Sequence, residues 1–393
     1  MRAESQEALL KLHHAGGAVV PRRRLLDNHA TPADALAAGK RAWREAELSE
    51  AQIHALERAD NDALAASRAW LAQPGHHLLG WHDPDYPPQL RRIPSPPLAL
   101  FVDGDPALLW HPSVAVVGSR VPTAGGRDTA YDFAHMLAAS GFAVASGLAA
   151  GVDAAAHQGA LAVESGLTIA VLGTGPDVPY PRENAGLMAQ IAARGAVVSE
   201  HAPGTLARPS QFPSRNRILA GLALGTLVIE ATLRSGALIT AKLAGDYGRE
   251  VFAVPGSIHN PMIRGCHQLI RDGACLVERA DEVIAAVIPV AAELAATLRS
   301  RLETPISMPV ETRETVVQPT RLDDPDYQNL WTALGHDPTG MDRLIERTGL
   351  TAAELSSMLL VMELEGHVSN HHGRYTRKTL SPNAPETGAG RGK

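Results

Sequence analysis

A unit of three parts recurs through the middle of the chain: a short aliphatic run, a loop that contains glycine, and a helical segment. Val114–Val117 leads into Gly118-Ser119-Arg120 and then into an amphipathic segment from Arg127 to Ala139. Aliphatic runs this short, bounded by glycine, are typical of buried parallel strands. Strands that alternate with helices predict a doubly wound α/β fold with a parallel sheet. The other strands that we expect are Phe142–Ala145, Thr168–Leu172, Ala196–Ser199, Thr226–Glu230, Val251–Val254 and, at an edge, Ala274–Val277.

Basic residues lie in two loops that such a sheet brings to the same edge. Arg120 follows the first strand, and Arg215 and Arg217 stand in the turn Phe-Pro-Ser-Arg-Asn-Arg, directly before an apolar helical segment. A basic turn at a helix start is a ready anion site, because free backbone N–H groups and the helix dipole add to the side-chain charge. Together with the Ser119 hydroxyl and with Lys242 on the following helix, these groups predict phosphate binding. On its own motif, Arg120 could equally pair with a carboxylate across the edge.

The polar residues of the glycine loops do not form a recognisable catalytic set. The pattern G-x-G-x-x-G is missing, and Glu230 is the one obvious acid for a ribose, so a dinucleotide site is poorly supported. No serine or cysteine stands in a nucleophile elbow. We interpret the polar residues as hydrogen-bond partners that fix loops, although Asp153 and His157, one helical turn apart, could also form an acid–base pair. The residues weighed as catalytic groups are Asp153, His157, Asp177, Tyr180 and Glu200.

Composition changes along the chain predict smaller parts on both sides of the α/β domain. The N-terminal part is rich in alanine and leucine and predicts a bundle of short helices, with Thr31 as an N-cap before Pro32. Its three arginines, Arg22 to Arg24, could touch a phosphate backbone, but a solvated turn is favoured. The predicted parts are a helical domain at 1–72, a connector at 73–112 that packs on the core, the α/β domain at 113–287, a linker at 288–321, a winged-helix-like domain at 322–380 and a disordered tail at 381–393.

The terminal module has a capping box at Thr351–Glu354 and a possible two-stranded wing at Gly366–Tyr375, which suits a winged helix-turn-helix. Its second helix carries acidic residues and no lysine or arginine, so it is poorly suited to reading DNA. A protein contact is favoured there. The acidic residues of this helix are Glu354, Glu363 and Glu365. The wing carries the basic residues Arg374, Arg377 and Lys378, which leave a weak role in DNA binding open.

Composition sets limits on the class of protein. The chain has 393 residues and a formal net charge of −6, which argues against a protein that coats polyanions over its whole surface, although a local basic groove is compatible with it. Only two cysteines occur, Cys266 and Cys275, and we expect both to be core residues. Without a signal peptide or a long apolar span, we expect a cytoplasmic protein with no membrane insertion. We assign no metal and no cofactor.

Several ordered motifs resemble the DprA/Smf family of DNA-processing proteins. They cover about residues 80–280 and read GSR-x-P-T, SGLA-x-GVD-x-x-AH, TIAVLGTG-x-D-x-x-YP, Ser199-Glu200, FPSRNRILAGL, VIEA-x-x-x-SGALITA and GR-x-VFAVPG. The resemblance implies an extended Rossmann-like domain, flanked by a small N-terminal helical SAM-like domain and a C-terminal winged-helix-like domain. It also implies a non-enzymatic homodimer that binds single-stranded DNA and loads the RecA recombinase onto it during natural transformation. The DNA-binding residues thus expected are Gly118, Ser119, Arg120, Phe212, Arg215, Asn216, Arg217 and Lys242, with Phe212 available for base stacking.

Two other functions stay open at this point. One is a nucleotide-processing Rossmann enzyme similar to the phosphoribohydrolases, which carry a Pro-Gly-Gly-x-Gly-Thr loop where this chain reads Ala231-Thr-Leu-Arg-Ser-Gly236. The other is an interaction hub that dimerises, with the apolar segment Ile218–Leu224 as a possible interface.

Overall fold

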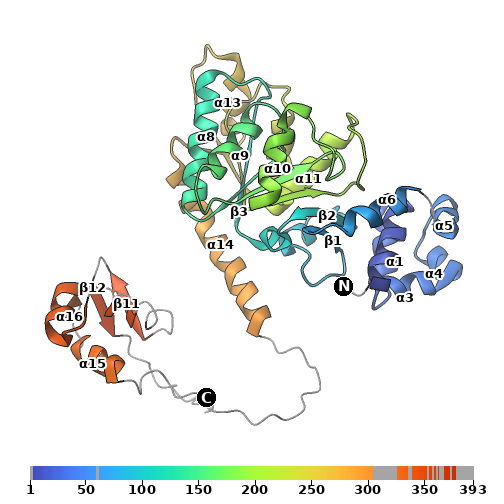
Figure 1. Ribbon diagram of the computed structural model, residues 1–393. Coiled ribbons are helices and arrows are strands. Elements are labelled where there is room, and N and C mark those ends of the chain that lie inside the picture. The colour runs from blue at the N-terminus through green and yellow to red at the C-terminus, as the bar shows by residue number, and fades with distance from the viewer. Residues whose placement is uncertain are drawn as a thin grey trace, which may run out of the picture. The chain divides into compact units, whose positions relative to one another are not determined.

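The computed structural model divides into two compact units, Met1–Pro305 and Ile306–Lys393. It describes residues 3–58, 62–303, 325–334, 339–351, 354–355, 358–359, 362, 367–371 and 374–377 (Figure 1). The linker prediction beyond 303, the tail 381–393, Glu363, Glu365 and Lys378 lie outside these residues.

The first unit is built on a nine-stranded sheet in the order β1-β2-β6-β5-β4-β3-β7-β8-β9. The strands from β3 to β9 pair in parallel, which confirms the predicted doubly wound sheet. Two antiparallel strands from the segment interpreted as a connector extend it, because β1 pairs with β2 and β2 pairs with β6. The bounds are β1 His76–Gly80, β2 Ala99–Gly104, β3 Ser113–Val117, β4 Ala143–Ser146, β5 Thr168–Leu172, β6 Ala196–Ser199, β7 Gly225–Val228, β8 Glu250–Ala253 and β9 Cys275–Leu276.

Helices cover both faces of this sheet. Alternate residues of a strand point to opposite faces, so Ala115 and Val117 of β3 pack in one core cluster and Val114 and Val116 in the other. Helices α7, α11, α12 and α13 cover the first face, and α8, α9 and α14 cover the second, with α10 beside α9 (Figure 1). The bounds are α7 Pro88–Arg91, α8 Ala124–Ala139, α9 Val152–Leu161, α10 Ala185–Arg194, α11 Gln211–Leu222, α12 Gly236–Asp246, α13 Arg264–Arg271 and α14 Ala280–Glu303, with short 3₁₀ turns at Pro106–Trp110, Arg182–Asn184 and Pro261–Ile263.

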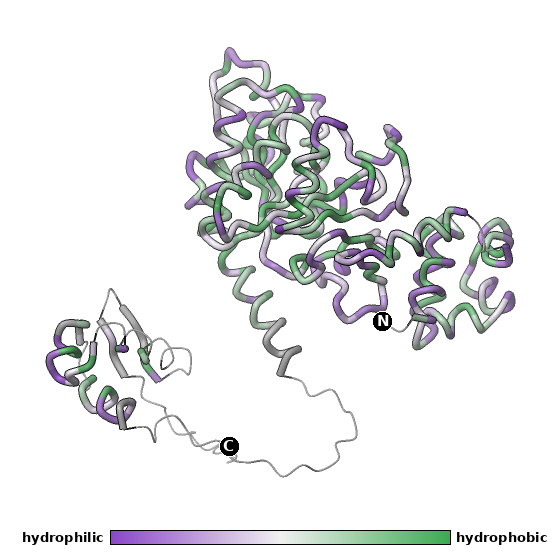
Figure 2. The backbone as a smooth tube through the Cα atoms, viewed as in Figure 1, coloured by the Kyte–Doolittle hydropathy of each residue, from purple (hydrophilic) through white to green (hydrophobic). Residues whose placement is uncertain are grey.

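Both faces of the parallel strands are therefore apolar, and Figure 2 shows hydrophobic residues gathered in the sheet and on the inner sides of its helices. The segment Ile218–Leu224, interpreted as a possible dimer face, belongs to this interior. Ile218, Leu219 and Leu224 are between 0% and 2% exposed, so the segment is not available for a partner. Its apolar side chains pack in the core clusters on the sheet.

The N-terminal residues fold into the predicted bundle of short helices. As expected, Thr31 caps a helix, since its side chain accepts a hydrogen bond from the Asp34 N–H at 3.1 Å. The bundle packs on the antiparallel hairpin, where Trp70 stacks on His76 and meets Phe101 edge to face. The helices are α1 Ala3–His14, α2 Val19–Asp27, α3 Pro32–Ala37, α4 Gly39–Glu45, α5 Glu50–Glu57 and α6 Asp62–Leu71.

Two sequence interpretations are corrected in this unit. Arg22 to Arg24 lie within α2 and not in a solvated turn: Arg22 is buried, and Arg24 pairs with Glu47. Cys275 is exposed, because it lies on the edge strand β9, whereas Cys266 is in the core as expected. Helix α14 ends at Glu303, so the described part of the segment 288–321 is helical.

The second unit combines short helices with a three-stranded sheet in the order β10-β12-β11. The predicted capping box forms, since Thr351 Oγ1 accepts from the Glu354 N–H and the Glu354 carboxylate accepts from the Thr351 N–H. The elements are α15 Pro325–Leu334, β10 Thr339–Gly340, α16 Met341–Thr348, β11 Val368–His371 and β12 Arg374–Arg377. The antiparallel pair β11 and β12 is the predicted wing.

Across the described residues of both units, no helix combines the length and the apolar composition needed to cross a membrane.

Candidate functional site

A cavity of about 520 Å³ opens at the carboxyl ends of the parallel strands, where loops after β3, β4 and β7 meet the first turns of α11 and α12. This is the edge at which open α/β sheets bind ligands. Six of the eight residues predicted for DNA binding line it, namely Gly118, Ser119, Arg120, Phe212, Arg215 and Asn216.

The loop after β3 gives the cavity its exposed cation. Gly118 packs against α9 so closely that a Cβ there would lie 2.7 Å from Val152 Cγ2. The Ser119 hydroxyl accepts the Val121 N–H at 3.1 Å, which leaves its own proton to donate. Arg120 is exposed, and among the described residues no acidic side chain forms an ion pair with it. The alternative in which Arg120 pairs with a carboxylate across the edge is therefore not what the structure shows.

Glu230 holds this loop in place and does not line the cavity. Its carboxylate accepts hydrogen bonds from the Thr123 N–H at 2.8 Å, from the Thr123 hydroxyl at 2.7 Å and from Asn260 Nδ2 at 3.3 Å. The side chain is 4% exposed. The acid that sequence reasoning considered for a ribose is thus occupied in fixing the loop that carries Arg120.

Arg215 lies beneath the cavity and is almost fully buried, with 5% exposure. Its Nη1 donates to the Val171 carbonyl at 2.6 Å, and the guanidinium fills the space beside Gly147, where a Cβ would come within 1.8 Å of Nη1. Burial lowers the pKa of Arg215 and the Asp153 carboxylate opposes that effect. Arg215 is therefore a positive charge in the floor of the cavity, bonded to the Val171 carbonyl and favoured by the field of the Asp153 carboxylate.

Aromatic rings form one side of the cavity. Tyr180 and Phe212 lie 5.1 Å apart between ring centroids, and the Arg120 guanidinium lies 5.5 Å from the centre of the Phe212 ring. Tyr180 is 44% exposed. Sequence reasoning weighed Tyr180 only as a catalytic group and missed it as an aromatic wall. The signal for this role is its position in a loop after β5, two strands from Arg120, at the same edge of the sheet.

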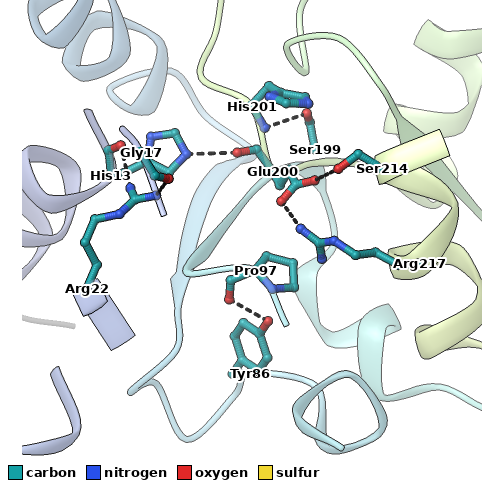
Figure 3. A network of polar contacts seen from close by, with 10 residues as sticks. All are labelled: His13, Gly17, Arg22, Tyr86, Pro97, Ser199, Glu200, His201, Ser214 and Arg217. Atoms are coloured by element: carbon teal, nitrogen blue, oxygen red, sulfur yellow. Dashed lines mark hydrogen bonds and ion pairs between the residues drawn. The ribbon is translucent and has the colours of Figure 1, made fainter. Parts of the chain in front are cut away.

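Arg217 and Lys242, the other two predicted residues, do not line the cavity. Arg217 does not reach the cavity because α11 begins at Gln211. The basic motif therefore lies in the first turns of the helix and not ahead of it. Residues two apart on a helix face nearly opposite directions. Arg215 therefore points to the cavity, while Arg217 pairs with Glu200 on the other side (Figure 3). Lys242 is exposed on α12.

Hydrogen bonds explain the remaining polar residues as partners that fix loops, as predicted. Asp153 accepts from the backbone N–H groups of Gly147 and Ala149, at 3.1 and 3.3 Å, and lines the cavity floor. Burial raises the pKa of Asp153, although Arg215 acts in the opposite direction. Asp177 accepts from the Gly204 N–H at 2.7 Å. Among the described residues, no cluster of three His, Cys, Asp or Glu side chains could hold a metal ion.

His157 is fully buried and does not line the cavity. The Thr168 hydroxyl donates to the Val144 carbonyl at 2.7 Å, so it must accept its second hydrogen bond, also 2.7 Å long, from His157 Nδ1–H. That assigns the proton to Nδ1 and leaves Nε2 buried without a partner. Burial, with a smaller contribution from Arg215, lowers the pKa of His157 to about 3.

This lowered pKa predicts how stability depends on pH. Below pH 6.5, the ordinary pKa of histidine, the unfolded chain binds a proton that folded His157 does not bind until about pH 3. The free energy of unfolding should therefore fall with falling pH in this window, by about 1.4 kcal/mol per pH unit from this group. Urea unfolding of wild type and His157→Gln across this range tests it. We expect a shallower pH dependence in the variant, and equal slopes would contradict the assignment.

Comparison with known proteins gives consistent matches over both units. The family model described as DNA recombination-mediator protein A matches residues 77–288, and a model of the DprA winged helix domain matches residues 314–374. Protein Smf of Escherichia coli is 38% identical over 317 residues, which are 80% of this chain and 81% of that protein. DNA processing protein DprA of Streptococcus pneumoniae is 45% identical over 203 residues, 52% of this chain and 71% of that protein. The X-ray structure of DprA from Streptococcus pneumoniae superposes with a TM-score of 0.63 at 35% identity, covering 70% of this chain and 95% of that one.

Proposed function

The chain belongs to the family of DNA recombination-mediator protein A, and we propose that it binds single-stranded DNA, without sequence preference, in the cavity at the carboxyl edge of its sheet. The observation that carries this proposal is the exposed guanidinium of Arg120 beside the rings of Phe212 and Tyr180. Cations that track a phosphate backbone, together with aromatic faces on which bases stack, are the general requirement for binding single strands.

Each part of the cavity suits one part of a nucleotide. Arg120 can make a forked contact to a phosphate, and the Ser119 hydroxyl has a proton to donate. Helix α12 begins at the cavity, so the positive end of its dipole favours an anion there, while Ser235 accepts from the Ala237 N–H. The rings of Tyr180 and Phe212 offer π faces, which accept any base. Contacts to phosphate and to ring faces carry no sequence information, which supports tolerant binding.

We propose further, from the family resemblance, that the protein is a cytoplasmic homodimer that loads the RecA recombinase onto the bound strand during DNA uptake and recombination. What supports this part is membership in the family of DNA recombination-mediator protein A. Direct capture of purified RecA on oligo(dT) coated with this protein, against uncoated oligo(dT), tests this part.

The binding proposal predicts a steep dependence on salt. We expect a fluorescent oligo(dT) to bind more tightly than a duplex of the same length in fluorescence anisotropy, because only an unpaired strand presents base faces to the rings. The logarithm of the affinity should fall linearly with the logarithm of salt concentration, by about 0.7 for each phosphate neutralised. Equal affinity for duplex, or an affinity that does not change with salt, would sink the proposal.

A nucleotide-processing enzyme is the second candidate. The cavity volume of about 520 Å³ lies in the range of small-ligand sites, and Asp153 is a carboxylate within it. Incubation with nucleoside monophosphates, followed by chromatography for released base, separates the two functions. Base release that is lost in Asp153→Asn would favour the enzyme.

A further inference from the structure

Glu200 occupies a junction between three parts of the first unit. It follows β6 directly, and its backbone carbonyl accepts a hydrogen bond from Nε2 of His13, at the end of α1, at 2.8 Å. Its carboxylate pairs with Arg217 and accepts from the Ser214 hydroxyl at 3.4 Å, both on α11 (Figure 3). One residue therefore joins the N-terminal helical bundle to the helix that forms a wall and the floor of the cavity.

We propose that Glu200 is a positioning residue through which the N-terminal helical bundle sets the strength of the grip on DNA. The inference rests on the single-strand binding proposed above. It assigns a role in that binding to two side chains, Glu200 and Arg217, that do not line the cavity. It also gives the helical bundle a function that needs no contact between the bundle and DNA.

The pair is buried enough to hold its helix. The side chains of Arg217 and Glu200 are 14% and 13% exposed, so water competes little for their charges. Arg217 Nη1 is buried and has no hydrogen-bond partner, which leaves Glu200 as the acidic anchor that the structure shows for this guanidinium. Removing one member of such a pair leaves the other charge buried and uncompensated. The Arg217 guanidinium would then move toward solvent, because its buried charge has lost its partner. The helix turn that carries Arg217 would shift with it.

The two sides of α11 transmit that movement to the cavity. Ser214 and Arg217 face Glu200, while Phe212 and Arg215 face the cavity. Arg215 has little freedom of its own, since it is bonded to the Val171 carbonyl and fills the space beside Gly147. A shift of the first turns of α11 therefore displaces the Phe212 ring and the Arg215 charge together. Side chains in a packed core respond as a group, because little empty volume is available.

On the bundle side, the contact is rigid. Arg22 donates to the carbonyls of Leu12, His13 and Gly17, each at 3.0 Å, and so fixes the end of α1. The His13 ring also meets Phe101 of β2 edge to face, with 5.2 Å between centroids. His13 is thus held at one place against the sheet, and its bond to the Glu200 carbonyl fixes the backbone from which the Glu200 side chain reaches α11.

Charge alone predicts the opposite sign for one variant, which makes the test sharp. Glu200 is an acid near the site of a polyanion, so its removal should tighten binding if only the net field mattered. Positioning predicts weaker binding. A residue that acts without touching phosphate should also leave the salt slope unchanged, whereas loss of a phosphate contact lowers the slope by about 0.7.

The experiment uses the full chain, a fluorescent oligo(dT) and a salt series, with urea unfolding of each variant as a record of stability. We expect Glu200→Ala to weaken binding about fivefold to tenfold with the wild-type salt slope. Arg217→Ala should weaken it similarly, and the double variant should be no weaker than Arg217→Ala, because the two residues act as one pair. His13→Ala should weaken binding in the same direction. The matched control is His29→Ala, which should bind as wild type does, because among the described residues the His29 ring bonds to the Leu25 carbonyl within the bundle and not to Glu200.

Each outcome decides between the two proposals. Wild-type or tighter binding by both Glu200→Ala and His13→Ala, while Arg120→Ala is weakened, would overturn the positioning role and leave the binding site standing. Wild-type binding by Arg120→Ala would overturn the binding site itself, and the positioning role with it. If Glu200→Ala fails to fold, Glu200→Gln and His13→Ala decide the question in the same way.

Discussion

Replacing Arg120 with alanine is expected to weaken binding of oligo(dT) by about 10-fold to 100-fold, the usual worth of a hydrogen-bonded contact to a charged group. Arg120 is the exposed cation of the cavity, beside the Phe212 ring, and it forms no ion pair with the described residues that would have to break before it could bind phosphate. Anisotropy titrations at several salt concentrations measure the effect. The salt slope should fall by about 0.7 in the variant, since one phosphate contact to a single strand is lost.

The matched control for this prediction is Arg127→Ala. Arg127 is an exposed arginine in the first turns of α8, a few residues along the same segment, and it does not line the cavity. Its loss changes the net charge equally, so the difference between the two variants isolates the geometric contribution. Arg120→Lys adds a second comparison, because lysine keeps the charge and loses the planar fork. Equal affinities for Arg120→Ala and Arg127→Ala would contradict the site.

Asp153→Ala is expected to lower the free energy of unfolding by about 2–6 kcal/mol, since each of two backbone N–H groups that loses its acceptor costs about 1–3 kcal/mol. The Asp153 carboxylate accepts from the Gly147 and Ala149 N–H groups, and alanine leaves both without this partner. The variant also removes a negative charge whose field favours the charged form of the buried Arg215 guanidinium. Urea unfolding followed by circular dichroism measures the loss.

Two companion variants test the cause of that loss. Gln158→Ala changes an exposed residue of the same helix, α9, and should stay within about 0.5 kcal/mol of wild type. Adding Arg215→Met to Asp153→Ala removes the uncompensated charge and should recover part of the stability. A stability of Asp153→Ala equal to that of Gln158→Ala would show that Asp153 does not anchor the cavity floor.

Much of the fold could be read from the repeated unit of strand, glycine loop and helix. Short aliphatic runs such as Val114–Val117 are buried on both sides, so their pattern reports a parallel sheet directly. The antiparallel hairpin of β1 and β2 was not predicted as part of that sheet. Its sequence is rich in proline, which indicates extended chain but does not indicate which strand it will pair with. Pairing with β6 depends on contacts between segments distant in sequence, and a local pattern carries no information about these.

The pattern of strands and loops is enough to place Gly118-Ser119-Arg120 and the basic motif of 212–217 at one cavity, because the carboxyl ends of parallel strands must meet at one edge. Which side chains of the basic motif reach that cavity depends on the folded helix. Arg215 and Arg217 look equivalent in the sequence, one on each side of Asn216. Once α11 begins at Gln211, the helical rotation of about 100° per residue turns them to opposite sides. Arg215 then lies in the floor of the cavity, while Arg217 pairs with Glu200, since a helix between two packed surfaces presents a different face to each.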